Sequence, residues 1–285
     1  MQRPDAVLSA PASPEQAVSS FEAARNASKV SANQAVDILS SDRIIPFAIA
    51  GKDAESEVAI TSAFLFQNTS DRAVTMMIEF FGPTGARIAL PTRDFNGAKR
   101  PAASVLSGTF GARQYDYLIV DATRLEGFKS FWVRLRTIPS GQVEVFHETL
   151  FSSLDNLSSS GGIDADLGYI GAPADRSNIG NWIFYMPPSE TGDVLINVTN
   201  GYSLRDVILT VRARASNGRE LCRGQRVVPV NTMYSFDPAQ LSDCFASLEG
   251  GYLLEVVSDR TDLFANSIIF PTEGPAGSLP RLLEQ

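Results

Sequence analysis

The feature that most constrains the fold is a change of hydrophobic period at Arg43. From there on, apolar and polar residues alternate in short runs that are separated by turn residues. In "VILTVRAR" (207–214) and "SFWVRLRT" (130–137), every second residue is apolar. No stretch between the predicted strands has a helical period long enough for a βαβ crossover. The pattern therefore predicts an all-β chain of antiparallel sheets, each with one buried face.

The same strand plan occurs twice. "FQNTSDRAVTMMIEFFGPTGARI" (66–88) and "NVTNGYSLRDVILTVRARASNGREL" (197–221) each place an Asn/Thr turn before an apolar strand and a glycine turn after it. When Gly85 is aligned with Gly218, the leading and closing strands of the two halves also correspond. With 285 residues, 44% of them hydrophobic, the chain is long enough for two cores. We therefore expect two tandem antiparallel β-sandwich domains.

The first forty residues differ in kind from the rest. Ser13, Pro14 and Gln16 form a capping-box arrangement that predicts a helix over 15–28, and Ser31 with Gln34 predicts another over 32–39. Their apolar residues are too sparse for an independent core. We expect either a helical cap on the first domain or an arm used in assembly. The predicted organisation is a helical extension (1–42), a first sandwich (43–152), a linker (153–180), a second sandwich (181–273) and a tail (274–285).

The first repeat is longer than the second. Gly85 to Phe151 spans 151 − 85 = 66 positions and Gly218 to Phe270 spans 270 − 218 = 52, a difference of 14. The extra residues fall in 91–114, which is rich in Gly, Ala and Ser and carries Arg93, Lys99 and Arg100. Long loops on β scaffolds commonly carry binding sites. The segment is expected to be a loop that either binds a ligand or is a flexible insertion.

Charge and hydropathy exclude several classes of protein. The net charge of −8 argues against a nucleic-acid partner, which needs a basic surface. No run approaches the roughly 18 apolar residues of a membrane-spanning helix, and "MQRPDAVLSAPASPEQ" lacks the apolar core of a signal peptide. Either the protein is not exported, or the sequence begins after a removed signal.

The only two cysteines, Cys222 and Cys244, lie 22 positions apart in the second half. A bridge between them would stabilise the fold by about 3 kcal/mol through loop closure. It would also place the protein outside the cytoplasm, in an extracellular or cell-surface setting. The alternative is a pair of unrelated buried thiols.

Few residues point to catalysis or metal binding. His147 is the only histidine, and no nucleophile motif accompanies it, so a hydrogen-bonded structural histidine is expected. Asp164 and Asp166 could offer oxygen ligands to calcium, but their spacing fails the EF-hand template, and turn-capping aspartates are the alternative. We expect no enzyme and no cofactor.

One strand carries an aromatic and basic stripe formed by Trp132, Arg134 and Arg136. Exposed flat aromatics stack on sugars in carbohydrate-binding sandwiches, and arginine can stack there too. Trp132 could instead cover the seam between the domains or pack under the N-terminal helices. The stripe, with Arg93, Lys99 and Arg100, is the candidate ligand-binding surface.

The repeated plan, over about 43–273, resembles the tandem immunoglobulin-like or fibronectin-like domains of bacterial secreted and cell-surface proteins. The Cys-Trp-Cys framework of true immunoglobulin domains is not present. The resemblance implies a non-catalytic structural or adhesion protein that associates with itself or with a protein partner. A glycan-binding module, an enzyme and a viral structural component are the other hypotheses.

Overall fold

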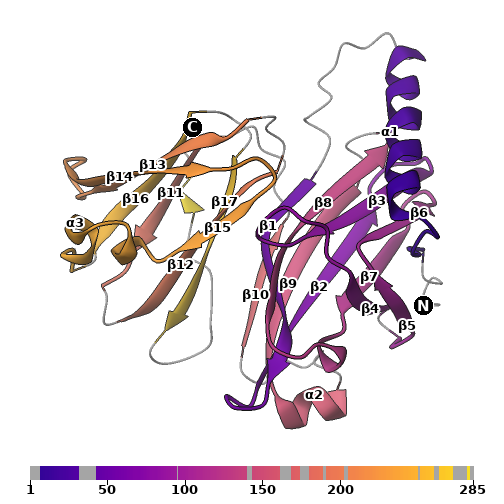
Figure 1. Cartoon of the computed structure of the whole chain (residues 1–285), viewed down its shortest axis with the longest axis horizontal. Helices are drawn as coiled ribbons and strands as arrows, with labels where there is room; N and C mark the ends of the chain where they lie inside the picture. Colours follow the sequence, from indigo (N-terminus) through magenta and orange to yellow (C-terminus); the bar gives the residue numbers. More distant parts are fainter. Residues whose placement is uncertain are drawn as a thin grey trace. The chain divides into compact units, whose positions relative to one another are not determined.

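The computed structural model describes residues 7–31, 43–94, 96–139, 143–160, 168–173, 180–188, 191–201, 205–249, 251–259, 263–271 and 281–282. By their internal contacts, the residues divide into two compact units (Figure 1). Unit 1 comprises Met1–Gly82, Ala86–Asp166 and Gly171–Arg176. Unit 2 comprises Pro83–Gly85, Leu167–Ile170 and Ser177–Gln285.

Unit 1 contains two antiparallel layers. Its strands are β1 (Arg43–Asp53), β2 (Val58–Asn68), β3 (Val74–Phe81), β4 (Leu90–Asp94), β5 (Lys99–Ala103), β6 (Val105–Phe110), β7 (Tyr115–Val120), β8 (Lys129–Ile138) and β9 (Val143–Ser153), together with residues 171–173 of β10 (Gly168–Pro173). One layer has the order β6-β3-β8-β1, and the other has β7-β2-β9, extended by β4 and β5 beside β7 and by β10 beside β9. Strand β1 pairs with β8 up to Ala50 and then with β2 from Gly51, so it joins the two layers.

Unit 2 repeats this arrangement. Its strands are β11 (Asn181–Met186), β12 (Gly192–Asn200), β13 (Val207–Arg214), β14 (Glu220–Val228), β15 (Met233–Phe236), β16 (Tyr252–Ser258), β17 (Leu263–Pro271) and β18 (Arg281–Leu282). One sheet has the order β14-β13-β16-β11-β18 and the other β15-β12-β17. Without β4, β5, β10 and β18, both units place their seven strands in the orders 4-3-6-1 and 5-2-7.

Both cores lie between the two layers. In unit 1, Phe64 of β2, Phe80 of β3 and Phe131 of β8 belong to one buried cluster. In unit 2, Trp182 of β11 and Ile196 of β12 belong to another. The strand order differs from the immunoglobulin constant type, in which the first strand shares a sheet with the second and the last shares one with the third and sixth. Here the first and last strands have exchanged sheets, and the fourth strand pairs with the third instead of the fifth.

The same asparagine closes the second strand of each unit. Asn68, at the end of β2, donates from Nδ2 to the carbonyls of Arg72 (2.6 Å) and Gly111 (2.8 Å). Asn200, at the end of β12, donates to those of Arg205 (3.0 Å) and Val228 (3.1 Å). Both side chains are completely buried. The repeated Asn turn in the sequence therefore marks a repeated structural role, in which one amide ties the loop to a neighbouring strand.

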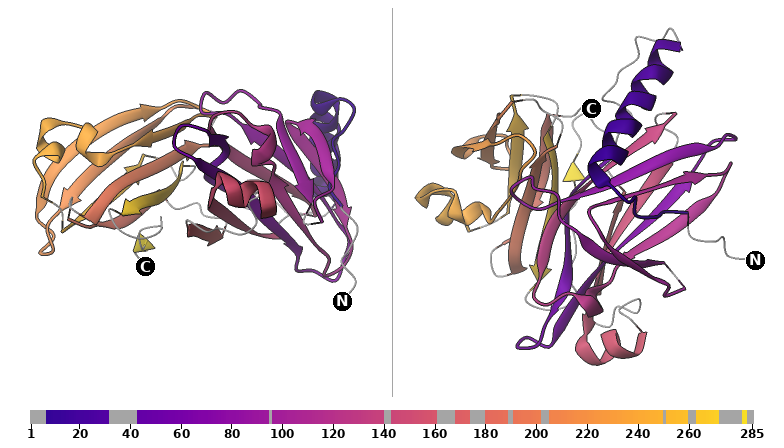
Figure 2. Two further views of the ribbon diagram at one scale, coloured as in Figure 1. Left: turned by 90° about the horizontal axis from the view of Figure 1, so that it is seen from below. Right: turned by 45° about the vertical axis from the view of Figure 1, so that its right-hand side comes forward.

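Helices are few. The helix α1 (Pro14–Ser31) lies along unit 1 beside β3, β6 and β8 (Figures 1 and 2). The other short elements are α2 (Leu154–Ser160), α3 (Asp243–Ala246) and the 3-10 turns Ala122–Arg124 and Pro238–Gln240. Ahead of α1, Ser9 exchanges two backbone hydrogen bonds with Ser107 of β6, each 2.9 Å long. The extension thus packs on unit 1, as the cap interpretation expects.

The all-β antiparallel class with a short N-terminal helix is confirmed. The predicted helix 32–39 lies outside the described residues. Within the predicted linker 153–180, the structure places α2 and β10, and the predicted domain limits stay predictions.

The segment 91–114 is not a loop, because β4 and β5 form a hairpin that pairs with β7. Pairing with a distant strand, which the local sequence does not reveal, gives this segment its extended form.

Candidate functional site

The stripe of Trp132, Arg134 and Arg136 lies on β8, on the side of its sheet that faces away from the core. We call this side the outer face of unit 1. The intervening residues Phe131 and Val133 point into the core cluster, as the alternation of the sequence predicts. The register of the sheet places Phe81 opposite Trp132 and Glu79 opposite Arg134. The stripe therefore meets a carboxylate and a second aromatic ring on β3.

Glu79 is the centre of this cluster. Its side chain is completely buried and forms ion pairs with three arginines: Arg87 at 2.8 Å, and Arg134 and Arg136 of β8 at 3.1 Å and 3.3 Å. Arg136 also pairs with Glu22 of α1. A buried carboxylate needs such partners, because its desolvation costs several kcal/mol. The arrangement supplies them and fixes α1 on the sheet.

The aromatic ring of the stripe is inaccessible to solvent. The Trp132 ring stacks on Phe81 with 4.2 Å between centroids, and the Arg134 guanidinium lies 4.7 Å from the Phe81 centroid. No part of Trp132 is exposed. The interpretation of Trp132 as a sugar-stacking platform is therefore wrong. Cross-strand packing with Phe81, set by a register that the local sequence does not show, occupies the ring.

The three basic residues of the β4–β5 hairpin have different environments. Lys99 is exposed, whereas Arg93, opposite it on β4, is buried. The side chain of Arg100 is 10% exposed, and its Nη2 lies 3.8 Å from Asp116 of β7. Asp116 also accepts hydrogen bonds from the backbone of Val7 and Leu8. The hairpin thus helps hold the N-terminal segment, and only Lys99 of the three is open to a ligand.

His147 is enclosed in unit 1. Its ring stacks on Phe64 at 4.9 Å, and Nε2 lies 3.3 Å from the Ser62 hydroxyl and 3.4 Å from that of Thr149. Burial lowers the pKa of His147 from 6.5 to about 3. Ser62 in turn donates to the Ile49 carbonyl at 2.8 Å. These are the contacts of a structural, neutral histidine.

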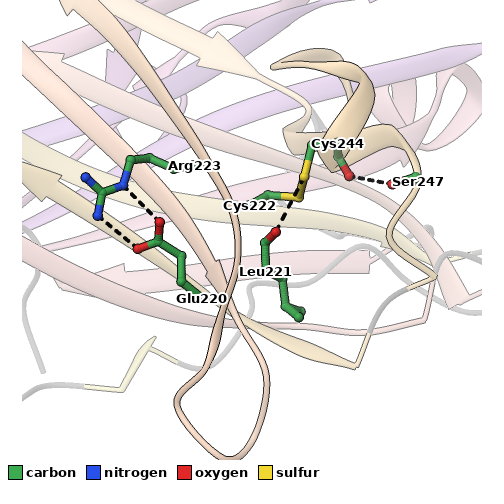
Figure 3. Close-up of a disulfide and its surroundings, with 6 residues drawn as sticks. All are labelled: Glu220, Leu221, Cys222, Arg223, Cys244 and Ser247. Atoms are coloured by element: carbon green, nitrogen blue, oxygen red, sulfur yellow. Dashed lines mark hydrogen bonds and ion pairs between the residues drawn. A yellow bond between two sulfur atoms is a disulfide. The ribbon is translucent and has the colours of Figure 1, made fainter.

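Cys222 of β14 and Cys244 of α3 are joined as a disulfide with a Cα–Cα distance of 5.9 Å (Figure 3). The bridge ties α3 to β14, an edge strand of its sheet. On the same strand, Glu220 and Arg223 form two hydrogen bonds of 3.0 Å, drawn beside the disulfide in Figure 3. The cysteines are therefore structural cross-links in unit 2.

The calcium candidates Asp164 and Asp166 lie outside the described residues. Within the part of the chain that the structure describes, no three His, Cys, Asp or Glu side chains gather in a group suited to a metal ion. In the same part, no helix has the length and apolar character needed to cross a membrane.

Two buried acids were missed by the sequence analysis. Glu79 stands alone in the apolar run "VTMMIEFF", and a lone charge in such a run is a usable signal of a buried ion pair. Asp116 lies in the alternating run "YDYLIV", where an inward or edge position cannot be told from a solvent-facing one. Most of their partners lie far away in the sequence: Arg134 and Arg136 for Glu79, and the backbone of Val7 and Leu8 for Asp116.

No protein-family model and no curated protein matches the sequence. Among solved structures, the Anabaena sensory rhodopsin transducer is 12% identical, with 31% of this chain and 94% of that chain covered and a TM-score of 0.27. A crystal structure of Thermotoga maritima 1070 is 9% identical, with 47% and 92% covered and a TM-score of 0.29.

A third structure is the Arthrobacter globiformis T6 isomalto-dextranase complexed with panose. It is 10% identical, with 79% of this chain and 36% of that chain covered and a TM-score of 0.22. At these TM-scores the likeness carries no argument about function. The class to which the architecture assigns this chain is an all-β protein with sandwich-like antiparallel sheets.

Proposed function

We propose that this chain is a non-catalytic structural or adhesion protein that works outside the cytoplasm and associates with itself or with a protein partner. The observation that carries the proposal is the repetition of one seven-strand plan in two units, down to the asparagine that ends the second strand. Many domains of cell-surface proteins share the sandwich architecture.

The residues that the sequence offered for chemistry support the same proposal. Trp132 stacks on Phe81, Arg134 and Arg136 bind Glu79, and His147 is buried as a neutral ring. Each of these side chains therefore contributes to the stability of unit 1. For this reason we do not propose the glycan-binding alternative, whose platform was Trp132.

The disulfide supports the extracytoplasmic part of the proposal, because such bridges persist in oxidising compartments. The oxidation state of the two cysteines can be measured directly by labelling free thiols with a maleimide in intact cells that produce the protein. We expect Cys222 and Cys244 to be unreactive until a reductant is added. Immediate labelling of both would contradict the proposed location.

Light scattering of the purified chain over a wide concentration range tests self-association. A mass that rises with concentration would support assembly, and a constant monomer would restrict the proposal to a different protein partner.

Measuring the turnover of a panel of hydrolase substrates tests the proposal that the chain is not a catalyst. Activity that disappears in a folded His147→Ala variant would overturn it.

A further inference from the structure

The two end strands of the sheet path in unit 1 are both protected. Strand β6 is paired with β3 on one side, and on the other side Ser107 exchanges two backbone hydrogen bonds of 2.9 Å with Ser9. At the opposite end of the path, β5 contains Pro101, which has no N–H to offer, and the Arg100 carbonyl accepts a hydrogen bond from Arg124 at 2.9 Å. Unprotected edges are templates for pairing with another chain, and unit 1 covers or blocks its own.

The strands of unit 2 can be matched to those of unit 1 residue by residue. The turns after β3 and β13 make the same backbone hydrogen bond, from Gly82 N to Ala86 O (2.8 Å) and from Ala215 N to Arg219 O (2.9 Å). Since 215 − 82 = 133, positions 133 apart are equivalent on β3 and β13.

This equivalence shows which backbone groups of β14 point outwards. Ser107 of β6 lies opposite Met77, and Gln225 of β14 lies opposite Thr210, which is 133 positions after Met77. Gln225 therefore takes the place of Ser107, whose N–H and C=O point away from β3 to bind Ser9. Because outward groups recur at every second residue of an antiparallel strand, those of Val227 point the same way.

The edge of β14 is open where the edge of β6 is covered. In the part of the chain that the structure describes, β14 is the last strand of its sheet, and the outward groups of Gln225 and Val227 meet no other backbone. The side chains of Gln225, Arg226 and Val227 are exposed, that of Val227 by 61%. A strand of nine residues, Glu220–Val228, therefore presents a long free edge.

A segment like the one that covers β6 does not fit this edge. At Gly108 of β6, a Cβ atom would lie 2.2 Å from the Val7 carbonyl oxygen, so the close approach depends on the missing side chain. Gly108 lies opposite Met76, and the equivalent residue of β14, opposite Leu209, is Arg226. The Arg226 side chain stands where the segment would pass. A strand that lies in the plane of the sheet avoids this obstacle.

A second copy of β14 is such a strand. In an antiparallel pair centred on Gln225, this residue faces its own copy, and its amide can both donate and accept a hydrogen bond. Arg223 then faces Val227, and Arg226 faces Gly224, which has no side chain to meet it. No like charges are directly opposite each other. Centring the pair on Arg223 or Arg226 would instead place arginine against arginine.

We propose that the open edge of β14 binds the β14 edge of a second copy of this chain, so that two five-stranded sheets join across a two-fold axis. The inference rests on the proposed function and assigns its self-association to one strand. Main-chain hydrogen bonds of Gln225 and its outward neighbours hold the pair. The aliphatic stem of Arg223 covers Val227. Because a two-fold contact uses both edges, assembly ends at the dimer.

The test follows the mass of the full chain by light scattering as its concentration rises. The mass should rise from 30.8 kDa towards twice that value and no further. Added salt should strengthen the dimer, because it screens the repulsion between two chains of net charge −8 and between the two Arg226 side chains, which are diagonal neighbours across the axis.

The deciding variant is Gln225→Pro. It removes the outward N–H, and with it both central hydrogen bonds of the dimer, while the pairing of β14 with β13 keeps its own donors. We expect dimerisation to weaken at least about tenfold. The matched control is Gln225→Thr, which retains the N–H and should change dimerisation little. Circular dichroism and the fluorescence of Trp182 establish that unit 2 is folded in each variant.

A pair of charge variants tests the register without proline. Val227→Lys places a positive charge against Arg223 of the second copy and should weaken the dimer, whereas Val227→Glu should strengthen it. Tyr185→Lys is the control, since it adds the same charge to the same sheet at a side chain of β11 that is 45% exposed and away from the edge. It should leave dimerisation unchanged.

Three results would overturn the inference. They are a monomer that persists up to about 1 mM, a dimer that a folded Gln225→Pro variant forms as well as the wild type, and equal dimerisation of the two Val227 variants. Each of them leaves the proposed function standing through another surface or a different protein partner. Turnover of hydrolase substrates, in contrast, bears on the proposed function and not on this edge.

Discussion

Unit 1 and unit 2 have the same strand plan but are stabilised by different means. Unit 1 is covered by α1, extended by the β4–β5 hairpin and held by a buried carboxylate with three arginines. Unit 2 has a disulfide and a smaller ion-pair cluster that is partly open to water. The plan therefore does not dictate how its outer face is closed, and a repeat can keep its fold while that face changes.

The difference is clearest in the ion pairs on the faces of the two units that point away from their cores. Glu79 of β3 faces Arg134 of β8, whereas at the equivalent register Arg212 of β13 faces Glu255 of β16. The acid and the base have exchanged strands. A cross-strand pair needs opposite charges at facing positions, but either strand can carry the acid.

The largest expected effect comes from removing the acid in each unit. Glu79→Gln leaves Arg134 and Arg136, whose side chains are only 11% and 10% exposed, and the more exposed Arg87 without their shared counter-charge. We therefore expect unit 1 to lose about 3–5 kcal/mol of unfolding free energy. Glu255→Gln should cost unit 2 about 1–2 kcal/mol, because its arginines are 25% and 32% exposed. Urea unfolding followed by tryptophan fluorescence measures both.

The chain allows each unit to be followed separately, since Trp132 lies in unit 1 and Trp182 in unit 2. Trp182→Phe leaves a reporter for unit 1 only, and Trp132→Phe one for unit 2 only. Glu126→Gln, at a side chain 85% exposed, is the control and should change little. Equal losses for Glu79 and Glu255 would refute the idea that burial distinguishes the two clusters.

The second effect belongs to unit 2 alone. Replacing both Cys222 and Cys244 by Ser removes a cross-link between residues 22 positions apart. The larger entropy of the unfolded chain should then lower the unfolding free energy by about 3 kcal/mol. Reductant should reproduce the shift in the wild type when Trp182 is the reporter. A comparable shift reported by Trp132 would show that the two units do not unfold independently.

The smallest effect belongs to unit 1 and depends on pH. Folded His147 stays neutral down to a pKa of about 3, while an unfolded histidine takes up a proton near 6.5. The unfolded state therefore binds more protons between these values, and stability falls as the pH falls through this window. We expect about 2.7 kcal/mol to be lost from this source at pH 4.5, two pH units below the pKa of the unfolded histidine.

His147→Gln should remove that part of the pH dependence while retaining a polar group near Ser62. Because His147 is the only histidine, unit 2 provides an internal reference for the titration of the carboxylates. Identical pH profiles of unit 1 in the wild type and the variant would contradict the assignment.

Local pattern predicted much of the fold, and distant pairing decided the rest. The alternation in 130–137 and 207–214 correctly predicted which residues of β8 and β13 face the core. The capping box correctly predicted a helix after Ser13, since Ser13 accepts the backbone hydrogen bond of Gln16. Both signals are carried by residues within a few positions of one another.

The candidate site was predicted less well because its contacts join distant strands. Trp132 is on the predicted outer side of its strand, but its ring meets Phe81 from 51 positions away (132 − 81). Arg134 and Arg136 bind Glu79 for the same reason. A sequence shows which side of a strand a residue occupies, whereas the neighbour on that side depends on strand order and register.

The passage of β1 from one layer to the other has a mechanical consequence. Gly51, where β1 leaves β8 for β2, has a φ of 143°, and a Cβ atom there would lie 2.2 Å from the Gly127 carbonyl oxygen. Because β1 and β9 each run antiparallel to β2, they are parallel to each other. Tension between the start of β1 and the end of β9 would load in shear the hydrogen bonds that β1 makes with β8 and β2 and those that β9 makes with β2. Many of these bonds would carry the load at once. Unit 1 should therefore resist stretching better than a sheet whose strands separate one hydrogen bond at a time.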